Sequence, residues 1–254
     1  MTVSLAAHHM SLKLPIFLQA EQTAKSWFRM LMRAAVEPPR REFRTIIDDV
    51  NFKALEGDRI GIVGRNGAGK STLLRMLAGA YEPTSGWLEV AGTKQALLNI
   101  SLGFNNEATL RENIYLRGTA MGLRAAQLME LVEPVLEFAE LREKAGHRLK
   151  TLSSGQRMRL GFAIATAVQH DIMVMDEWIG AGDASFIKKA KERMAGRVDG
   201  AKIVVLASHN FQLMKDVCNK GILLERGRVM HMGDIHETLK EYEVLLKNHA
   251  SADV

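Results

Sequence analysis

The chain has a single cysteine, Cys218, among its 254 residues. This excludes an internal disulfide, and we expect Cys218 to be a small buried side chain. Long apolar runs are also missing, because no uninterrupted stretch approaches the roughly 18 residues that suggest a transmembrane helix. The N-terminus lacks a charged lead followed by an apolar block, as a signal peptide would have. These absences lead us to expect a cytosolic chain.

The chain also offers little support for a histidine metal site or for a second domain. His8 and His9 are adjacent, but they have no companion ligands at suitable spacing, so we do not interpret them as a metal site. The length suits one sizeable α/β core, and a second domain of ordinary size would leave too little chain for the first. We therefore expect a single domain over residues 1–254.

The sequence GRNGAGKST at residues 64–72 satisfies the P-loop pattern G-x-x-x-x-G-K-[ST]. The preceding RIGIVG is typical of a short buried strand, and STLLRMLAG has helical spacing, so the required strand-loop-helix order is present. Its glycines allow successive N–H groups to face phosphates at a helix N-terminus. We expect Lys70 to reach the β- and γ-phosphates of ATP and Ser71 to ligate Mg²⁺. The predicted nucleotide contacts are Gly64, Arg65, Asn66, Gly67, Ala68, Gly69, Lys70, Ser71 and Thr72.

Two acidic residues follow a second apolar strand, IMVMDE at residues 172–177. Ligands of open α/β sheets bind at the carboxyl ends of strands, so Asp176 is placed to hold Mg²⁺ and Glu177 to polarise the attacking water. The next strand, in KIVVLASHN, ends near His209, which could reach the γ-phosphate or the water. The predicted catalytic residues are Lys70, Asp176, Glu177 and His209.

The motif LSSGQ at residues 152–156 opens a helix that continues as RMRLGFAIATAV. P-loop, signature, Asp-Glu strand and histidine in this order resemble the ATP-binding cassette (ABC) ATPases, whose signature is LSGGQ. The resemblance spans nearly the whole chain. It implies an α/β fold: a P-loop NTPase, ABC-type nucleotide-binding domain with a RecA-like core, an antiparallel β portion and a helical signature subdomain.

The resemblance also implies a homodimer with two ATP molecules between the copies, because a signature in that family contacts the ATP of the opposite subunit. The signature residues expected there are Ser153, Ser154, Gly155 and Gln156. Ser154 stands where the family has glycine. Asp183, in IGAGD, resembles the loop residue that crosses the dimer interface.

Two further blocks, SLGFNNEATLRENIYLRG and DEWIGAGDASFIKKA, resemble the ATPase subunits of O-antigen, capsular and teichoic-acid polysaccharide exporters. That resemblance implies two ABC-2 type permease subunits as partners and a lipid-linked polysaccharide as the transported substrate. It also implies a peripheral position on the cytoplasmic side of the bacterial inner membrane. We expect no extra C-terminal carbohydrate-binding domain, because the chain has no room for one.

Two family features have no obvious counterpart. The glutamine that touches Mg²⁺ and contacts the permease is missing, and Asn105 is the predicted substitute, with Glu107 as the alternative. The aromatic that stacks on adenine is predicted to be Phe17, while Phe43 is nearer the P-loop; either could instead belong to the core. By the same resemblance the permease surface would come from residues 103–120.

Positive charge is concentrated in residues 21–44, where the net charge is 6 − 3 = +3. The pattern predicts a basic amphipathic helix over residues 20–36, with Lys25, Arg29 and Arg33 on one face. Such a helix suits an anionic membrane surface, and equally an amphipathic helix packed on the protein's own core. Nucleic-acid binding would use the same charges, but the blocks above favour the membrane.

Within the domain, we expect a nucleotide-binding core over residues 40–102 and 165–235, a helical subdomain over 105–164 and a closing helix over 235–250. Export of another lipidic substrate is an alternative function. So is a soluble single-cassette assembly ATPase, whereas the single P-loop and the lack of a heptad run disfavour ribosomal and DNA-repair ABC proteins.

Overall fold

The computed structural model describes residues 2–17, 41–98, 103–176 and 184–252. Along the chain these residues form β1 (Ser4–Phe17), β2 (Arg41–Leu55), β3 (Arg59–Val63), α2 (Lys70–Ala78), β4 (Ser85–Ala91), β5 (Lys94–Leu97), α3 (Leu110–Ala120), α4 (Ala125–Phe138), η1 (Arg142–Lys144), η2 (Leu149–Thr151), α5 (Ser154–Ala165), β6 (Ile172–Asp176), α6 (Ala184–Gly200), β7 (Ile203–Ala207), α7 (Phe211–Val217), β8 (Lys220–Glu225), β9 (Arg228–Asp234) and α8 (Ile235–Ala252). The basic helix predicted over residues 20–36 lies outside the described residues.

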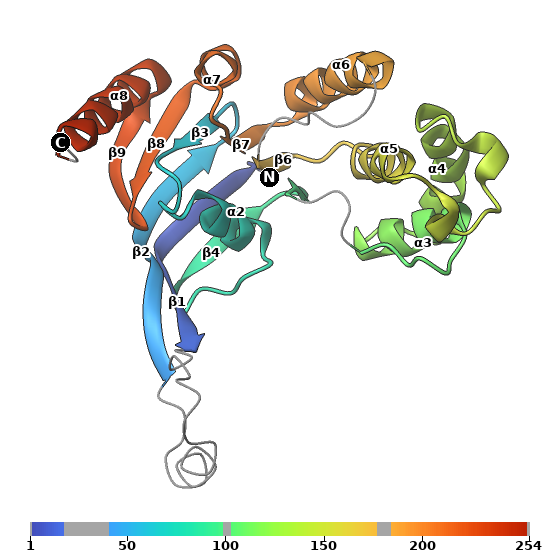
Figure 1. Ribbon diagram of the computed structural model, residues 1–254, viewed down its shortest axis with the longest axis horizontal. Helices are drawn as coiled ribbons and strands as arrows, with labels where there is room; N and C mark the ends of the chain where they lie inside the picture. Colours follow the sequence, from blue (N-terminus) through green and yellow to red (C-terminus); the bar gives the residue numbers. More distant parts are fainter. Residues whose placement is uncertain (1, 18–40, 99–102, 177–183, 253–254) are drawn as a thin grey trace, which may run out of the picture.

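Two sheets organise the chain (Figure 1). The larger has the order β5-β6-β7-β3-β8-β9, in which β9 alone runs antiparallel to its neighbour. The smaller has the order β2-β1-β4 and is antiparallel. Because parallel strands end at one edge of a sheet, this order brings the carboxyl ends of β3, β6 and β7 together.

The larger sheet is covered on both faces, and the alternation of β7 illustrates how. Ile203 and Val205 join a core with α2 and the antiparallel sheet. Val204 and Leu206, one residue on, join a second core with α6, α7 and α8. Figure 1 shows α6, α7 and α8 in a row along one side of this sheet, with α2 on the other. A strand covered on both sides reads as a continuous apolar run, as IVVLA does.

The helices α3, α4 and α5 extend to one side of the sheets and have a core of their own (Figure 1). Three phenylalanines connect them to α6: Phe138 on α4, Phe162 on α5 and Phe186 on α6, with ring centroids 5.7–6.0 Å apart. The signature helix α5 therefore packs against α6, which covers the parallel sheet.

This architecture is the predicted α/β class, with a parallel core, an antiparallel β portion and a helical part that carries the signature. Among the described residues, no helix is long and apolar enough to cross a membrane. The segment where the sequence predicted a closing helix forms α8.

Candidate nucleotide-binding site

The P-loop turns between the end of β3 at Val63 and the start of α2 at Lys70. Its first glycine has no alternative, because a Cβ at Gly64 would lie 2.2 Å from the carbonyl oxygen of Leu224. The last, Gly69, is the N-cap of α2 with φ 107°, and no side chain caps the helix. The sequence thus places a tight backbone turn before an uncapped helix N-terminus, which favours an anion.

A cavity of about 630 Å³ opens over this loop. Nine of the predicted site residues line it, from the P-loop and the ends of two strands. These are Arg65, Asn66, Gly67, Gly69, Lys70, Ser71, Thr72, Asp176 and His209. The predicted contacts Gly64 and Ala68 are not part of the lining, and Ala68 is 4% exposed.

Lys70 folds back over the loop that precedes it. Its Nζ donates to the carbonyl oxygens of Gly64, at 2.6 Å, and of Arg65, at 3.2 Å. Phosphate oxygens would offer this ammonium stronger, charge-assisted hydrogen bonds than neutral carbonyls do. The ammonium of Lys70 is therefore held at the cavity, where it can exchange its carbonyl partners for the phosphates of a nucleotide.

The acidic and histidine residues reach the cavity from neighbouring parallel strands. Asp176, the last residue of β6, pairs in register with Ala207 of β7, and His209 follows two residues later. Both side chains line the cavity together with Ser71. Glu177 and Asp183 lie outside the described residues, so their predicted roles stay predictions.

The sequence did not identify every lining residue. Those that it missed are Arg44, Ile46, Leu98, Ala207 and Ser208. Ala207 and Ser208 precede His209 directly, so their proximity could have been inferred. Arg44 was visible in the sequence only as part of the basic segment, and nothing in the pattern tied it to the P-loop.

The signature residues lie elsewhere. Ser153 is the N-cap of α5, and its Oγ accepts a hydrogen bond from the Gln156 amide at 3.2 Å, while Gln156 Oε1 accepts one from the Ser153 amide at 3.2 Å. None of Ser153, Ser154, Gly155 and Gln156 lines the cavity of its own chain. A capping box explains why a serine and a glutamine stand three residues apart here.

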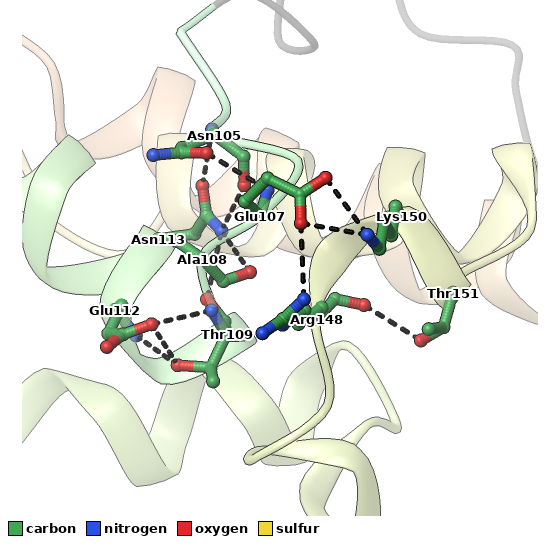
Figure 2. Close-up of polar contacts among 9 residues, drawn as sticks. All are labelled: Asn105, Glu107, Ala108, Thr109, Glu112, Asn113, Arg148, Lys150 and Thr151. Carbon is green, nitrogen blue, oxygen red and sulfur yellow. Dashed lines mark hydrogen bonds and ion pairs between the residues drawn. The ribbon is translucent and has the colours of Figure 1, made fainter.

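Asn105 and Glu107, the two candidates to replace the missing glutamine, both form hydrogen bonds with nearby residues of the helical part (Figure 2). Asn105 Oδ1 accepts a hydrogen bond from the Glu107 amide at 3.0 Å, and Asn105 does not line the cavity. The Glu107 carboxylate accepts from Lys150 Nζ, at 2.8 Å and 3.0 Å, and from Arg148 at 3.3 Å. Contact of Asn105 with Mg²⁺ stays a prediction.

The two candidate aromatics are both on the β1–β2 hairpin. Phe17 pairs in register with Arg41, at the end of the described hairpin. Phe43 is 64% exposed and does not line the cavity, although its neighbour Arg44 does. Successive residues of a strand face opposite sides of the sheet, which explains why Arg44 reaches the cavity and Phe43 does not.

A family model described as "ABC transporter" matches residues 47–180, more than half of the chain. The chain belongs to the ABC transporter family. It therefore carries the ATPase domain of that family, and ATP is its nucleotide. The predicted fold class and family are confirmed.

Three relatives are similar over most of this chain. A teichoic acids export ATP-binding protein of Staphylococcus haemolyticus is 38% identical, covering 80% of this chain and 76% of its own length. An O-antigen export system ATP-binding protein of Klebsiella pneumoniae is 32% identical, covering 81% and 86%. A teichoic acids export ATP-binding protein of Bacillus anthracis is 36% identical and covers 84% of this chain, which spans 39% of that longer protein.

Among solved structures, the ATP-binding subunit of an ABC transporter superposes with a TM-score of 0.68 at 22% identity. The match covers 96% of this chain and 99% of that one. At this identity the likeness supports the fold and not the substrate.

Proposed function

We propose that this ABC transporter chain is the ATP-hydrolysing subunit of an exporter that moves a lipid-linked polysaccharide across the bacterial inner membrane. The observation that carries the proposal is the 32–38% identity, over about four fifths of the chain, to ATP-binding proteins named for teichoic acid and O-antigen export. The subunit would act as a peripheral protein on the cytoplasmic side, bound to transmembrane permease subunits of the ABC-2 type.

The cavity offers the groups that phosphoryl transfer requires. Ser71 and Asp176 supply a hydroxyl and a carboxylate oxygen to one cavity, which is the kind of ligand that Mg²⁺ prefers. They would hold the ion, which would neutralise charge on the β- and γ-phosphates. Lys70 would release the carbonyls of Gly64 and Arg65 and donate to the same phosphates.

The hydrolytic step would take place at the carboxyl ends of β6 and β7. His209 lines the cavity there and would contact the γ-phosphate. Glu177 follows Asp176 in the chain and would take a proton from the attacking water. The N-terminus of α5, with Ser153 as its cap, would complete the site of a second copy of the chain, so that closing of the dimer accompanies ATP binding.

The deciding experiment is a pull-down from detergent-solubilised membranes of the native host. Glu177→Gln protein with ATP serves as bait, because it should remain closed on its nucleotide, and Lys70→Ala protein is the matched control that should not close. Recovery of a polytopic permease with the first bait, identified by mass spectrometry in stoichiometric amount, would support the proposal. Recovery of soluble partners alone would overturn it.

A further inference from the structure

We propose that Arg44 is the platform for the nucleotide base, so that a guanidinium stacks on adenine where the sequence led us to expect an aromatic ring. The inference deepens the proposed function and rests on ATP binding in the P-loop cavity. It begins from the position of Arg44 on β2, far from the P-loop in sequence, yet in the lining of the same cavity.

The arrangement of the strands gives the nucleotide a direction. Asp176 and His209 come from β6 and β7, which lie on one side of β3 in the sheet. On the other side lie β8 and β9, and the turn between them is bonded to β2, since the amide of Asp48 donates to the carbonyl of Gly227 at 2.9 Å. With the terminal phosphate at Asp176 and His209, the base must lie toward β2.

Two residues of β2 line the cavity at that end, Arg44 and Ile46. Among the described residues that line the cavity there is no phenylalanine, tyrosine or tryptophan. Across the hairpin, Arg44 pairs in register with Leu14, which is 38% exposed and shares its face of the sheet. An exposed planar cation beside aliphatic side chains suits the face of a purine.

The chemistry of this surface also predicts its selectivity. The guanidinium plane stacks on any base, because every base has a π-face. Ile46 and Leu14 offer no side-chain hydrogen bonds that could distinguish adenine from guanine. We therefore expect Arg44 to strengthen the binding of ATP and GTP by similar factors, while the phosphate contacts remain with the P-loop.

The test compares ligands with and without a base by calorimetry, in the presence of magnesium. Arg44→Lys keeps the charge and removes the plane, so we expect ATP and GTP to bind about 3- to 30-fold more weakly while inorganic tripolyphosphate binds as before. Arg44→Tyr restores a stacking surface and should recover most of the ATP affinity. Phe43→Ala, which changes the next residue on the opposite face, is the matched control and should leave all three affinities unchanged.

Three results would overturn the inference. Unchanged ATP affinity in Arg44→Lys would remove the stacking role. Equal weakening of ATP and tripolyphosphate in Arg44→Ala, with recovery of both in Arg44→Lys, would assign Arg44 to the phosphates. Loss of ATP affinity in Phe43→Ala would return the base to an aromatic. If the unsubstituted protein bound neither ATP nor tripolyphosphate, the nucleotide site itself would fail, and with it the proposed function.

Discussion

The side-chain amide of Asn113 is bonded to both backbone groups of Asn105. Asn113 Oδ1 accepts from the Asn105 amide at 2.8 Å, and its Nδ2 donates to the Asn105 carbonyl at 2.9 Å (Figure 2). The same Nδ2 donates to the carbonyls of Ala108 and Thr109. Asn113 is fully buried on α3, so one side chain holds the loop that the family resemblance assigns to the permease.

This relationship predicts that Asn113→Ala destabilises the protein by about 1–3 kcal/mol, because the buried polar groups lose their partners. Asn113→Asp should cost at least as much, since a carboxylate cannot donate to the three carbonyls. Denaturant unfolding measures both. Asn51→Ala is the control, because Asn51 bonds to His9 at the exposed surface; its cost should stay near 0.5 kcal/mol as a rough estimate. Equal costs at the two sites would refute the assignment.

The P-loop glycines should differ in their tolerance of a side chain. Gly64→Ala would place a Cβ 2.2 Å from the Leu224 carbonyl oxygen, whereas a Cβ at Gly67 meets nothing within 4 Å. Gly67→Ala carries only the strain of a left-handed backbone, φ 80°, of about 1–2 kcal/mol. We expect Gly64→Ala to lose more stability and more ATP affinity. Thermal unfolding with and without ATP tests the order, and a milder Gly64→Ala would contradict it.

Glu177→Gln should keep ATP binding and lower hydrolysis by on the order of 10²–10⁴, the usual contribution of a general base. The measurements are the nucleotide affinity and the steady-state rate of phosphate release. The Lys70→Ala variant should instead lose binding, because its ammonium is the cation held at the loop. Near-normal turnover in Glu177→Gln would exclude the proposed role.

Glu107 should contribute to stability in a pH-dependent way. The hydrogen bonds from Lys150, assisted by the charge of Arg148, hold the pKa of its carboxyl below the ordinary value of 4.5. A carboxyl with a depressed pKa stabilises the folded state above its unfolded pKa, and this contribution is lost as the pH falls through the folded pKa. Glu107→Gln should therefore reduce the loss of stability below about pH 4.5.

Urea unfolding midpoints measured over the acid range check this expectation. Glu137→Gln, which removes the same charge from α4, serves as the comparison. Identical pH profiles for the Glu107 and Glu137 variants would show that the ion pairs with Lys150 and Arg148 add nothing specific.

Cys218 should be unreactive in the folded protein. It is 6% exposed, in the core formed with α6, α7 and α8, and this burial raises the pKa of its thiol to about 12. The thiolate is the reactive form, so a thiol reagent at neutral pH should modify the native chain very slowly and the denatured chain at one site. Rapid labelling of the native protein would contradict the packing of α7.

The sequence predicted the parts of the site that neighbouring residues encode. The glycines at 64 and 69 and the lysine at 70 specify a turn and a helix start within nine residues, and the cavity lies over them. Asp176 ends β6 and His209 follows β7 by two residues, and both line the cavity because parallel strands end at one edge of the sheet; their chemical roles stay predictions. Motif order alone was enough to indicate the family.

The position of Arg44 at the cavity is one that such reasoning does not reach. Whether Phe43 or Arg44 lines the cavity depends on which face of β2 each residue occupies, and that depends on the register with β1. A shift of one residue in the pairing of β2 with β1 would turn Arg44 away from the cavity and place Phe43 there. A single sequence carries no direct signal of that register.

By itself, the sequence determined the α/β class, the P-loop and the family, because these depend on local backbone preferences and on residue order along the chain. Only the tertiary structure decided that Arg44 reaches the cavity and that Asn113 holds the loop at Asn105. Both depend on contacts between separate segments, set by strand pairing, helix packing and the need of buried polar groups for partners.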